Sequence, residues 1–369
     1  FWKEVRQFIR KRKGGSDQTI TKEDWYNYFK GVFNPDAEAD STQPVNSESL
    51  YDEHNLHKDE DVLHIDGDDV NDDDMLTDEN DVNDGDMLTN ENDDCDAYLN
   101  DDITVAEVKR AMQKLKSGKA GGMDGVLPDM LKAAEDCAVA FMTPLFNKIF
   151  KEGLYPETWC KAVICPIHKK GDKHIADNYR GVSLLCIISK CYTSGLNARL
   201  VKRTQVYEKI VESQAGFRKK YSTVDHIFTL SSIIEKSLSK RRGKLYVAFV
   251  DLRKAFDSVD RQSLFRALSE AGISGRMLKS LMSIYKSVLS CVRAGSSRTD
   301  FFECPLGLRQ GCCLSPSLFT LFINAVEDNM GAQGRHGIQL MPGLLELFLL
   351  MFADDIALLS DTAQGLQNQ

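Results

Sequence analysis

The feature that most restricts how this chain can fold is an acidic segment between residues 36 and 102. The segment carries 26 Asp and Glu side chains and a single basic side chain, Lys58. Like charges at this density, with almost no aromatic residues among them, cannot bury enough apolar surface to offset the chain entropy lost on folding. We therefore predict that residues 36–102 are a disordered spacer in the 369-residue chain.

The spacer contains a direct repeat of twelve residues. DVNDDDMLTDEN at residues 69–80 is followed at once by DVNDGDMLTNEN at residues 81–92. The second copy weakly resembles a calcium-binding loop, but Gly85 falls one position early and no Glu stands at the twelfth position. We interpret the repeat as solvated chain whose charge could mimic that of nucleic acid.

The remaining parts of the chain carry the opposite charge. Residues 1–35 hold 8 basic and 4 acidic side chains, and residues 103–369 hold 37 basic and 25 acidic side chains, although the whole chain has a net charge of −9. Excess positive charge on a folded body favours polyanionic partners such as nucleic acid.

Cysteine usage and hydropathy limit the cellular compartment. The ten cysteines include no CxxC pair and no His at zinc-ligand spacing, which favours reduced thiols over a disulfide framework or a metal site. No run approaches the roughly 18 uncharged apolar residues of a spanning helix. The N-terminus at Phe1 lacks the apolar core of a signal peptide. We expect a protein of the cytosol or nucleus that is neither membrane-inserted nor secreted.

Helical patterns flank the acidic spacer on both sides. Aromatic residues at helical spacing predict a short amphipathic helix over residues 24–33. After the spacer, Thr104 and Glu107 have the spacing of a capping box, and they predict a helix that Gly118 ends. Similar patterns continue, so residues 103–149 are predicted to be helical.

From Trp159 onward the pattern changes to a mixture of strands and helices. Strands are predicted within residues 161–172 and 244–251, a hairpin within 290–304, helices within 263–272, 276–289 and 315–330, and two apolar runs within 347–360. This mixture predicts an α+β domain with an antiparallel sheet backed by helices.

The pair Asp354–Asp355 separates the two last apolar runs. Adjacent carboxylates repel each other and are unfavourable in an apolar setting unless a cation neutralises them. A hard divalent metal with oxygen ligands is one explanation. An ordinary hairpin turn is the other, because Asp is a favoured turn residue.

A further aspartate, Asp251, ends the apolar run LYVAFV. A strand that carries Asp251 beside a hairpin that carries Asp354 would bring three carboxylates together, and such a cluster can hold two divalent ions for phosphoryl or nucleotidyl transfer. Asp257 and Asp260 lie past the strand, and Asp260 is placed to cap the next helix. We therefore assign structural roles to Asp257 and Asp260.

These motifs together resemble those of a known family. FVDLRKAFDSVD, GLRQGCCLSPSLFTLFIN and FADDIALL, in this order, are similar to the palm motifs of reverse transcriptases. PIHKKGDKHIADNYRGVSLL and SQAGFRKKYSTVDH resemble the finger motifs, and GKAGGMDG resembles the loop before them. The resemblance covers residues 103–359 and is closest to the polymerase of non-LTR (LINE-type) retrotransposons. It implies the fingers and palm of a right-hand polymerase, with a helical connecting segment at residues 1–35 and a reverse transcriptase domain at residues 150–369.

The resemblance also implies the residues of the active site. Asp251 and Asp354 match the metal-binding aspartates, with Asp355 as a third carboxylate, and the implied cofactor is a pair of Mg²⁺ ions, with Mn²⁺ as the alternative. Phe256 matches the bulky residue that excludes a ribose 2′-hydroxyl, although without the motif we would assign it to the core. The implied nucleotide-binding residues are Lys169, Lys170 and Arg180 in the fingers, and Gln310 and Gly311 beside the pocket.

The implied activity is that of an RNA-directed DNA polymerase, with template RNA, primer DNA and dNTPs as partners, acting within the cell as a ribonucleoprotein. Arg218, Lys219 and Lys220 are the basic residues expected to bind nucleic acid. The family's thumb would lie beyond Gln369, and its endonuclease would precede Phe1, so we expect a truncated copy. The alternative is a catalytically inactive, nucleic-acid-binding remnant of such an element. The sequence specifies no oligomeric state.

Overall fold

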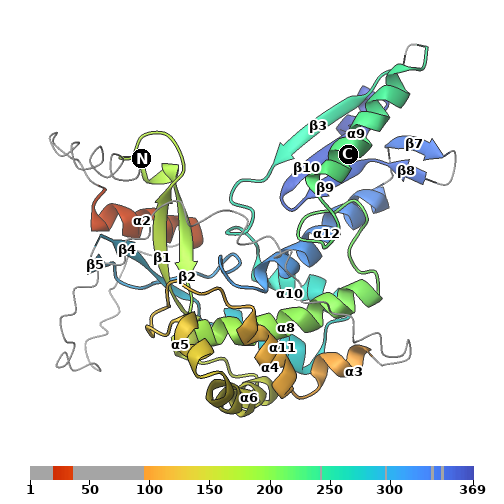
Figure 1. Ribbon diagram of the computed structural model, residues 1–369. Coiled ribbons are helices and arrows are strands. Elements are labelled where there is room, and N and C mark those ends of the chain that lie inside the picture. The colour runs from red at the N-terminus through yellow and green to blue at the C-terminus, as the bar shows by residue number, and fades with distance from the viewer. Residues whose placement is uncertain (1–19, 36–94, 242, 296, 334–335, 342–344) are drawn as a thin grey trace, which may run out of the picture.

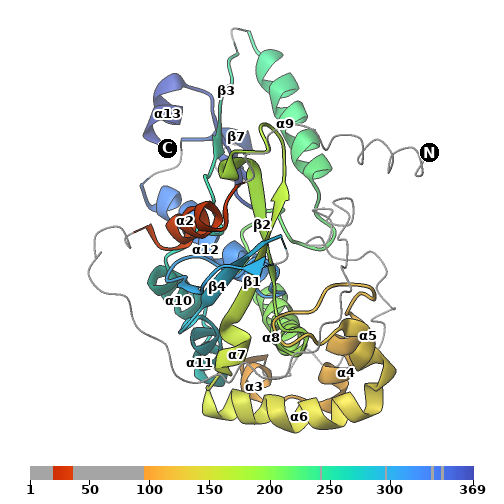
Figure 2. The same ribbon diagram turned by 90° about the vertical axis from the view of Figure 1, so that its left-hand side faces the viewer.

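The computed structural model describes residues 20–35, 95–241, 243–295, 297–333, 336–341 and 345–369. The predictions for the twelve-residue repeat, and for the rest of the acidic spacer as far as residue 94, lie outside the described residues. The described elements form a helical base that carries one sheet on each side (Figures 1 and 2).

The helix α2 (Lys22–Phe33) forms where the aromatic spacing predicted it. Thr21 is its N-cap. The Asp24 amide donates to Thr21 Oγ1 at 3.1 Å, and the Thr21 amide donates to Asp24 Oδ2 at 2.9 Å, so a capping box closes. The helix buries Trp25, Phe29 and Phe33, and it lies against the sheet on the left of Figure 1.

The helical base follows next along the chain. Its members are α3 (Cys95–Asn100), α4 (Val105–Gln113), α5 (Pro128–Ala133), α6 (Glu135–Glu152), α7 (Glu157–Cys160), α8 (Ile187–Val206), α10 (Arg261–Glu270) and α11 (Gly275–Tyr285). Thr104 and Glu107 form the predicted capping box of α4. The helix ends at Gln113 rather than at Gly118, because the chain first leaves it through a turn in which Gly118 has a φ of 74°.

A buried ion pair ties the end of the acidic segment to this base. Arg199 of α8 donates from Nε to Glu107 Oε1 at 2.6 Å and from Nη2 to Glu107 Oε2 at 2.8 Å. It also donates to the backbone carbonyl oxygens of Asp101 at 2.7 Å and Asp102 at 3.0 Å. Residues 95–102 therefore belong to the folded base, and the predicted end of the disordered spacer at residue 102 is wrong, because these carbonyls complete the bonding of Arg199.

The first sheet contains β1 (Lys161–His168), β2 (Tyr179–Leu184), β4 (Leu289–Ala294), β5 (Ser297–Arg298) and β6 (Phe302–Glu303). Its order is β2-β1-β4-β5, with β6 paired to β4. A short 3₁₀ helix, η3 (Ala176–Asn178), precedes β2. The β1–β2 pair is antiparallel and the β1–β4 pair is parallel, so this sheet is mixed.

The second sheet has the order β3-β10-β9 and is antiparallel throughout. Its strands are β3 (Tyr246–Asp251), β9 (Leu349–Phe352) and β10 (Asp355–Ser360), and helices α9 (Thr223–Leu238) and α12 (Ser315–Gln333) lie beside it (Figure 1). A two-stranded ladder of β7 (Ile338–Met341) and β8 (Leu345–Leu347), and the helix α13 (Ala363–Asn368), complete the described elements. The predicted α+β class is confirmed, with an antiparallel sheet backed by helices.

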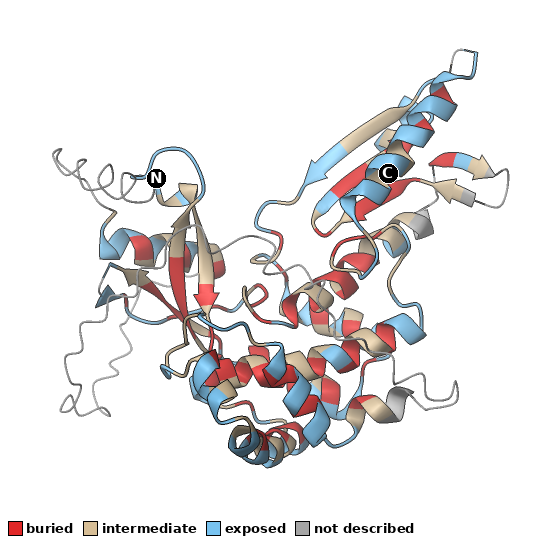
Figure 3. Cartoon of the chain, viewed as in Figure 1, coloured by how far each residue is buried: buried red, intermediate tan, exposed pale blue. Residues whose placement is uncertain are grey.

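Burial is concentrated in the base and beneath the first sheet (Figure 3). A smaller cluster, which includes Ile233 of α9 and Leu350, Ala357 and Leu359 of the second sheet, holds α9 against that sheet. Among the described helices, none combines the length and the apolar character needed to cross a membrane.

Candidate active site

The Asp354–Asp355 pair lies at a tight hairpin between β9 and β10. Phe352 is paired with Asp355, so Ala353 and Asp354 alone connect the two strands. Ala353 has a φ of 57°, and a positive φ at the first loop position is a feature of two-residue hairpin turns. The hairpin predicted from the two apolar runs is confirmed, with Asp354 in its turn and Asp355 at the start of β10.

Asp251 reaches the same edge from the neighbouring strand. It is the last residue of β3, and it lies directly opposite Asp355 in the antiparallel ladder. Residues in directly opposite positions project to the same face, with Cβ atoms about 5 Å apart. The predicted juxtaposition of Asp251 with the hairpin is therefore confirmed.

Negative charge accumulates at this edge, which we call the carboxylate edge (Asp251, Asp354 and Asp355). Burial raises the pKa of the Asp354 carboxyl above its ordinary value, and the charges of Asp355 and Asp251 raise it further. The positive charge of Arg180 acts in the opposite direction. Among the described residues, no Lys or Arg forms an ion pair with the carboxylate edge.

The carboxylate edge offers oxygen atoms of the type that divalent cations bind. Carboxylate oxygens are the hard ligands that Mg²⁺ prefers. All three side chains are of this chemical type, and the strand register places Asp251 opposite Asp355. Within the described ranges, no group of three or more His, Cys, Asp or Glu side chains is gathered as a metal site. The residues therefore fit a cation by charge and position, without a finished coordination shell.

The predicted finger residues lie on the β1–β2 hairpin. Lys169 and Lys170 follow β1 and are exposed, and the Lys169 amide donates to the carbonyl oxygen of Asn178 at 2.9 Å. Arg180 lies on β2, opposite Ile167 of β1. The positive charge of Arg180 acts to lower the pKa of Asp354.

Asp257 contacts the Gln310 segment, and the structural role that the sequence suggested for it stays a prediction. Its Oδ1 accepts a hydrogen bond from Gln310 Nε2 at 2.8 Å. Burial raises the pKa of Asp257 to about 6, while the Gln310 bond and the charges of Lys254, Arg180 and Lys169 act in the opposite direction. Asp260 caps α10 as expected by accepting from the Ser263 amide at 2.7 Å.

Phe256 lies between the core and the site. Its ring stacks on Phe319 of α12 with centroids 4.4 Å apart and an interplanar angle of 15°, and it meets the edge of Phe217 at 5.9 Å. The Phe256 carbonyl oxygen accepts from the Leu308 amide at 2.7 Å. The ring is only partly buried, so it packs on the core and also presents surface next to Asp257.

Gln310 and Gly311 lie in the segment that leads into α12. Gly311 has a φ of 81°, and a Cβ at this position would lie 2.9 Å from the carbonyl oxygen of Ser183 on β2. Only glycine fits where the two backbones come this close. The backbone that approaches Gly311 is β2 of the protein itself, and the predicted role of Gly311 in nucleotide binding stays a prediction.

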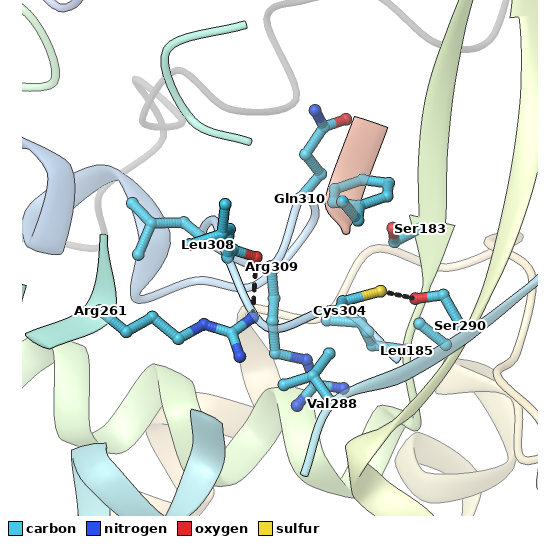
Figure 4. A pocket seen from close by; sticks show the side chains of 12 residues that line it. Ser183, Leu185, Arg261, Val288, Ser290, Cys304, Leu308, Arg309 and Gln310 are labelled. Carbon is cyan, nitrogen blue, oxygen red and sulfur yellow. Dashed lines mark hydrogen bonds between the residues drawn. The ribbon is translucent and has the colours of Figure 1, made fainter. Parts of the chain in front are cut away.

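A small pocket lies beneath this segment (Figure 4). Its volume is about 20 Å³, which accommodates roughly one water molecule. The buried Arg309 side chain points into it and donates from Nη2 to the Trp159 carbonyl oxygen at 2.6 Å, while Gln310 points away (Figure 4). This pocket is too small for a nucleotide.

The basic segment at residues 218–220 differs in part from the expectation. Arg218 stacks over the Tyr221 ring at 3.8 Å and donates to the Gln214 carbonyl oxygen at 3.0 Å and to Glu212 Oε1 at 3.1 Å. The Arg218 guanidinium therefore holds its own loop together. Lys219 and Lys220 are exposed, and the predicted contact with nucleic acid rests on these two residues.

Comparison with known proteins gives one family match. The family described as "Reverse transcriptase (RNA-dependent DNA polymerase)" matches residues 167–369. This span contains the carboxylate edge, the finger residues Lys169 and Arg180, and the Gln310 segment.

The similar curated proteins come from mobile elements. The chain is 27% identical to the RNA-directed DNA polymerase from mobile element jockey of Drosophila funebris over 263 residues, which are 70% of this chain and 28% of that protein. It is 29% identical to the probable RNA-directed DNA polymerase from transposon BS of Drosophila melanogaster over 275 residues, 72% of this chain and 29% of the relative. The chain therefore spans less than a third of the length of these relatives.

Among solved structures, apo telomerase from Candida tropicalis, truncated from its C-terminal domain, is 14% identical with a TM-score of 0.42, over 61% of this chain and 49% of that one.

Proposed function

Because the chain belongs to the reverse transcriptase (RNA-dependent DNA polymerase) family, we propose that it contains the fingers and palm of a non-LTR retrotransposon polymerase. Its reaction is the extension of a DNA 3′-hydroxyl on an RNA template with dNTPs. The observation that carries the proposal is the carboxylate edge, in which Asp251 lies directly opposite Asp355 beside the turn that bears Asp354.

The carboxylate edge is the proposed site of two Mg²⁺ or Mn²⁺ ions, with Asp251, Asp354 and Asp355 as the protein ligands. Such ions, when bound, lower the pKa of an attacking hydroxyl and neutralise the charge on the leaving oxygens. The protein contributes acceptor oxygens on two paired strands, whose register fixes their separation. No side-chain general base is required.

The finger residues are the proposed contacts of the incoming triphosphate. The positive charge of Arg180 acts to lower the pKa of both Asp354 and Asp257, which supports its assignment to an anionic ligand beside these carboxyls. A guanidinium offers several planar donors to phosphate oxygens, and Lys169 and Lys170 add point charges from the adjacent turn.

The wall of the nucleotide pocket is proposed to consist of Phe256 and Gln310. The stack of Phe256 on Phe319 makes the ring rigid, and a rigid ring beneath the sugar rejects a 2′-hydroxyl by steric overlap. The bond from Gln310 to Asp257 orients the Gln310 amide at the same wall. Lys219 and Lys220 are the proposed contacts of the template and primer backbone.

The experiment is single-nucleotide extension of a DNA primer annealed to an RNA template, with dNTP and Mg²⁺. The wild-type chain is compared with Asp354→Asn, and binding of the same duplex is measured in parallel. We expect extension by the wild type and its loss in Asp354→Asn, with duplex binding retained. Near-normal extension by Asp354→Asn would refute the metal assignment, and binding without extension by the wild type would instead identify an inactive nucleic-acid-binding remnant.

A further inference from the structure

The hairpin that bears Asp354 is held by a segment from a distant part of the chain. Residues 213–216 run beside β9, and Gln214 forms an isolated parallel bridge with Met351. The Met351 amide donates to the Ser213 carbonyl oxygen at 2.7 Å, and the Ala215 amide donates to the Met351 carbonyl oxygen at 2.9 Å. The segment therefore extends the second sheet at the hairpin end of β9.

The Gln214 side chain binds both backbone polar groups of the residue that precedes Asp354. Its Oε1 accepts from the Ala353 amide at 2.9 Å, and its Nε2 donates to the Ala353 carbonyl oxygen at 3.2 Å. The same Oε1 accepts from the Gly216 amide at 2.7 Å. Gln214 has no exposed surface, so these bonds are not exchanged with water.

Two further observations show that the turn backbone is confined. Ala353 holds a left-handed φ of 57°, which L-residues with a side chain rarely adopt unless their surroundings impose it. A Cβ on Gly216 would lie 2.2 Å from the Ala353 backbone nitrogen, so only glycine fits there. On the other side, His226 Nε2 lies 2.9 Å from the Met351 carbonyl oxygen.

We propose that Gln214 is a positioning residue for the carboxylate edge. By holding both the N–H and the C=O of Ala353, it fixes the rotation of the turn and thereby the direction in which Asp354 points relative to Asp251. The inference rests on the proposed function, because the direction of Asp354 matters only if the carboxylate edge binds a cation. It accounts for a fully buried amide that bonds both backbone polar groups of one turn residue.

The test compares variants of the full chain. Gln214→Met keeps a similar length and volume and removes every side-chain bond to Ala353. Gln214→Glu keeps the acceptor oxygen for the Ala353 and Gly216 amides, and it serves as the conservative rescue. The matched control is Asn147→Leu, because Asn147 bonds both the amide and the carbonyl oxygen of Ile103, at 2.6 and 2.8 Å, in the helical base.

Two quantities are measured: Mn²⁺ affinity by electron paramagnetic resonance, and amide hydrogen exchange of peptides that cover residues 349–358. We expect Gln214→Met to weaken Mn²⁺ binding about tenfold, which is the low end of the effect of outer-shell partners, and to speed exchange across the turn. Gln214→Glu should recover most of the affinity. Asn147→Leu should lower the melting temperature and leave both quantities at the hairpin unchanged.

The outcomes separate this inference from the proposed function. Unchanged Mn²⁺ affinity and unchanged exchange in Gln214→Met, or changes that merely match those of Asn147→Leu, would overturn the positioning role. If the wild type and Asp251→Asn bind Mn²⁺ equally, the metal site fails, and exchange at the turn still decides whether Gln214 holds the hairpin. If Gln214→Met does not fold, Gln214→Asn, which is one methylene too short to span Ala353, replaces it in the same comparison.

Discussion

The helical base and the carboxylate edge differ in whether their charged side chains are paired with the opposite charge. In the base, the Arg199 side chain is 1% exposed, and it is neutralised by Glu107 through two bonds of 2.6 and 2.8 Å. At the edge, the like charges of Asp251 on β3, Asp355 on β10 and Asp354 in the adjoining turn come together. Among the described residues, no Lys or Arg forms an ion pair with them. The charge in the base is neutralised within the chain, whereas the charges at the edge are not.

The difference indicates which region serves folding and which serves a ligand. A buried charge that is paired and hydrogen-bonded needs nothing further. Gathered carboxylates oppose folding, because repulsion and burial both raise the pKa of Asp354. Such a cluster is expected where a cation completes it, and perturbed carboxyls of this kind concentrate at functional sites.

The largest effect is expected from a substitution in the carboxylate edge. Asp251→Asn keeps the shape of the side chain and removes its charge, so RNA-templated primer extension should fall by roughly a thousandfold, equivalent to about 4 kcal/mol of transition-state stabilisation. The unfolding free energy should not decrease, because a repulsive charge is removed. Steady-state extension and urea unfolding measure the two quantities. A loss of stability in parallel with activity would show that Asp251 is needed for folding.

The next largest effect is expected from removing the buried ion pair of the helical base. Glu107→Ala leaves Arg199 buried without its carboxylate and should lower the unfolding free energy by about 3–5 kcal/mol. Extension per folded molecule should stay near the wild-type value at low temperature, because Glu107 is in the base. Chemical denaturation gives the first quantity. A variant that unfolds like the wild type would show that the pair contributes little.

Phe256 packs on Phe319 of the core and is also the proposed wall of the nucleotide pocket, so it sharpens the comparison. If it is the sugar wall, Phe256→Ala should raise the rNTP/dNTP ratio of kcat/KM by about tenfold or more, because each ~1.4 kcal/mol of lost discrimination is a factor of ten. The control is Phe265→Ala, which removes a ring packed near Tyr285 in the base. A ratio that stays constant while both variants lose stability would make Phe256 a core residue only.

A smaller effect depends on pH. Burial raises the pKa of Asp257 from 3.8 to about 6, so the folded chain binds this proton more tightly than the unfolded chain. The resulting stabilisation is complete below pH 3.8 and is lost as the pH rises through about 6. Asp257→Asn keeps an acceptor for Gln310 and should exceed the wild type in unfolding free energy by about 1–2 kcal/mol at pH 7. The two chains should converge near pH 4, and a difference that is constant with pH would rule out this titration.

The smallest effect concerns the acidic segment. Replacing the acidic residues between 36 and 94 with Asn and Gln removes negative charge that competes with nucleic acid for the basic body. Affinity for an RNA–DNA hybrid should rise a few-fold at low salt and converge with the wild type at high salt, because screening removes the competition. Equal affinities at every salt concentration would show that the segment does not approach the body. Residues 95–102 are left intact, because they bind Arg199.

The parts that could be predicted from the sequence are those set by local pattern. Asp251 ends an apolar run and Asp354 separates two others, so strand and hairpin geometry bring them together. The capping box at Thr104 is likewise local. The contacts of Asp257 and Gln214 were not predictable, because their partners lie 53 and 139 positions away along the chain. Only the tertiary approach of those segments creates the bonds.

Thermal melting of the wild type and Asp354→Asn, each with and without Mg²⁺, tests most directly whether the carboxylate edge binds a cation. If the carboxylate edge is a cation site that opposes folding when it lacks the cation, Asp354→Asn should melt at the same or a higher temperature than the wild type without Mg²⁺. Mg²⁺ should then stabilise the wild type and leave the variant unchanged, because a ligand that binds only the folded chain raises its stability. A variant that melts lower without Mg²⁺, or that responds to Mg²⁺ as the wild type does, would contradict the central claim.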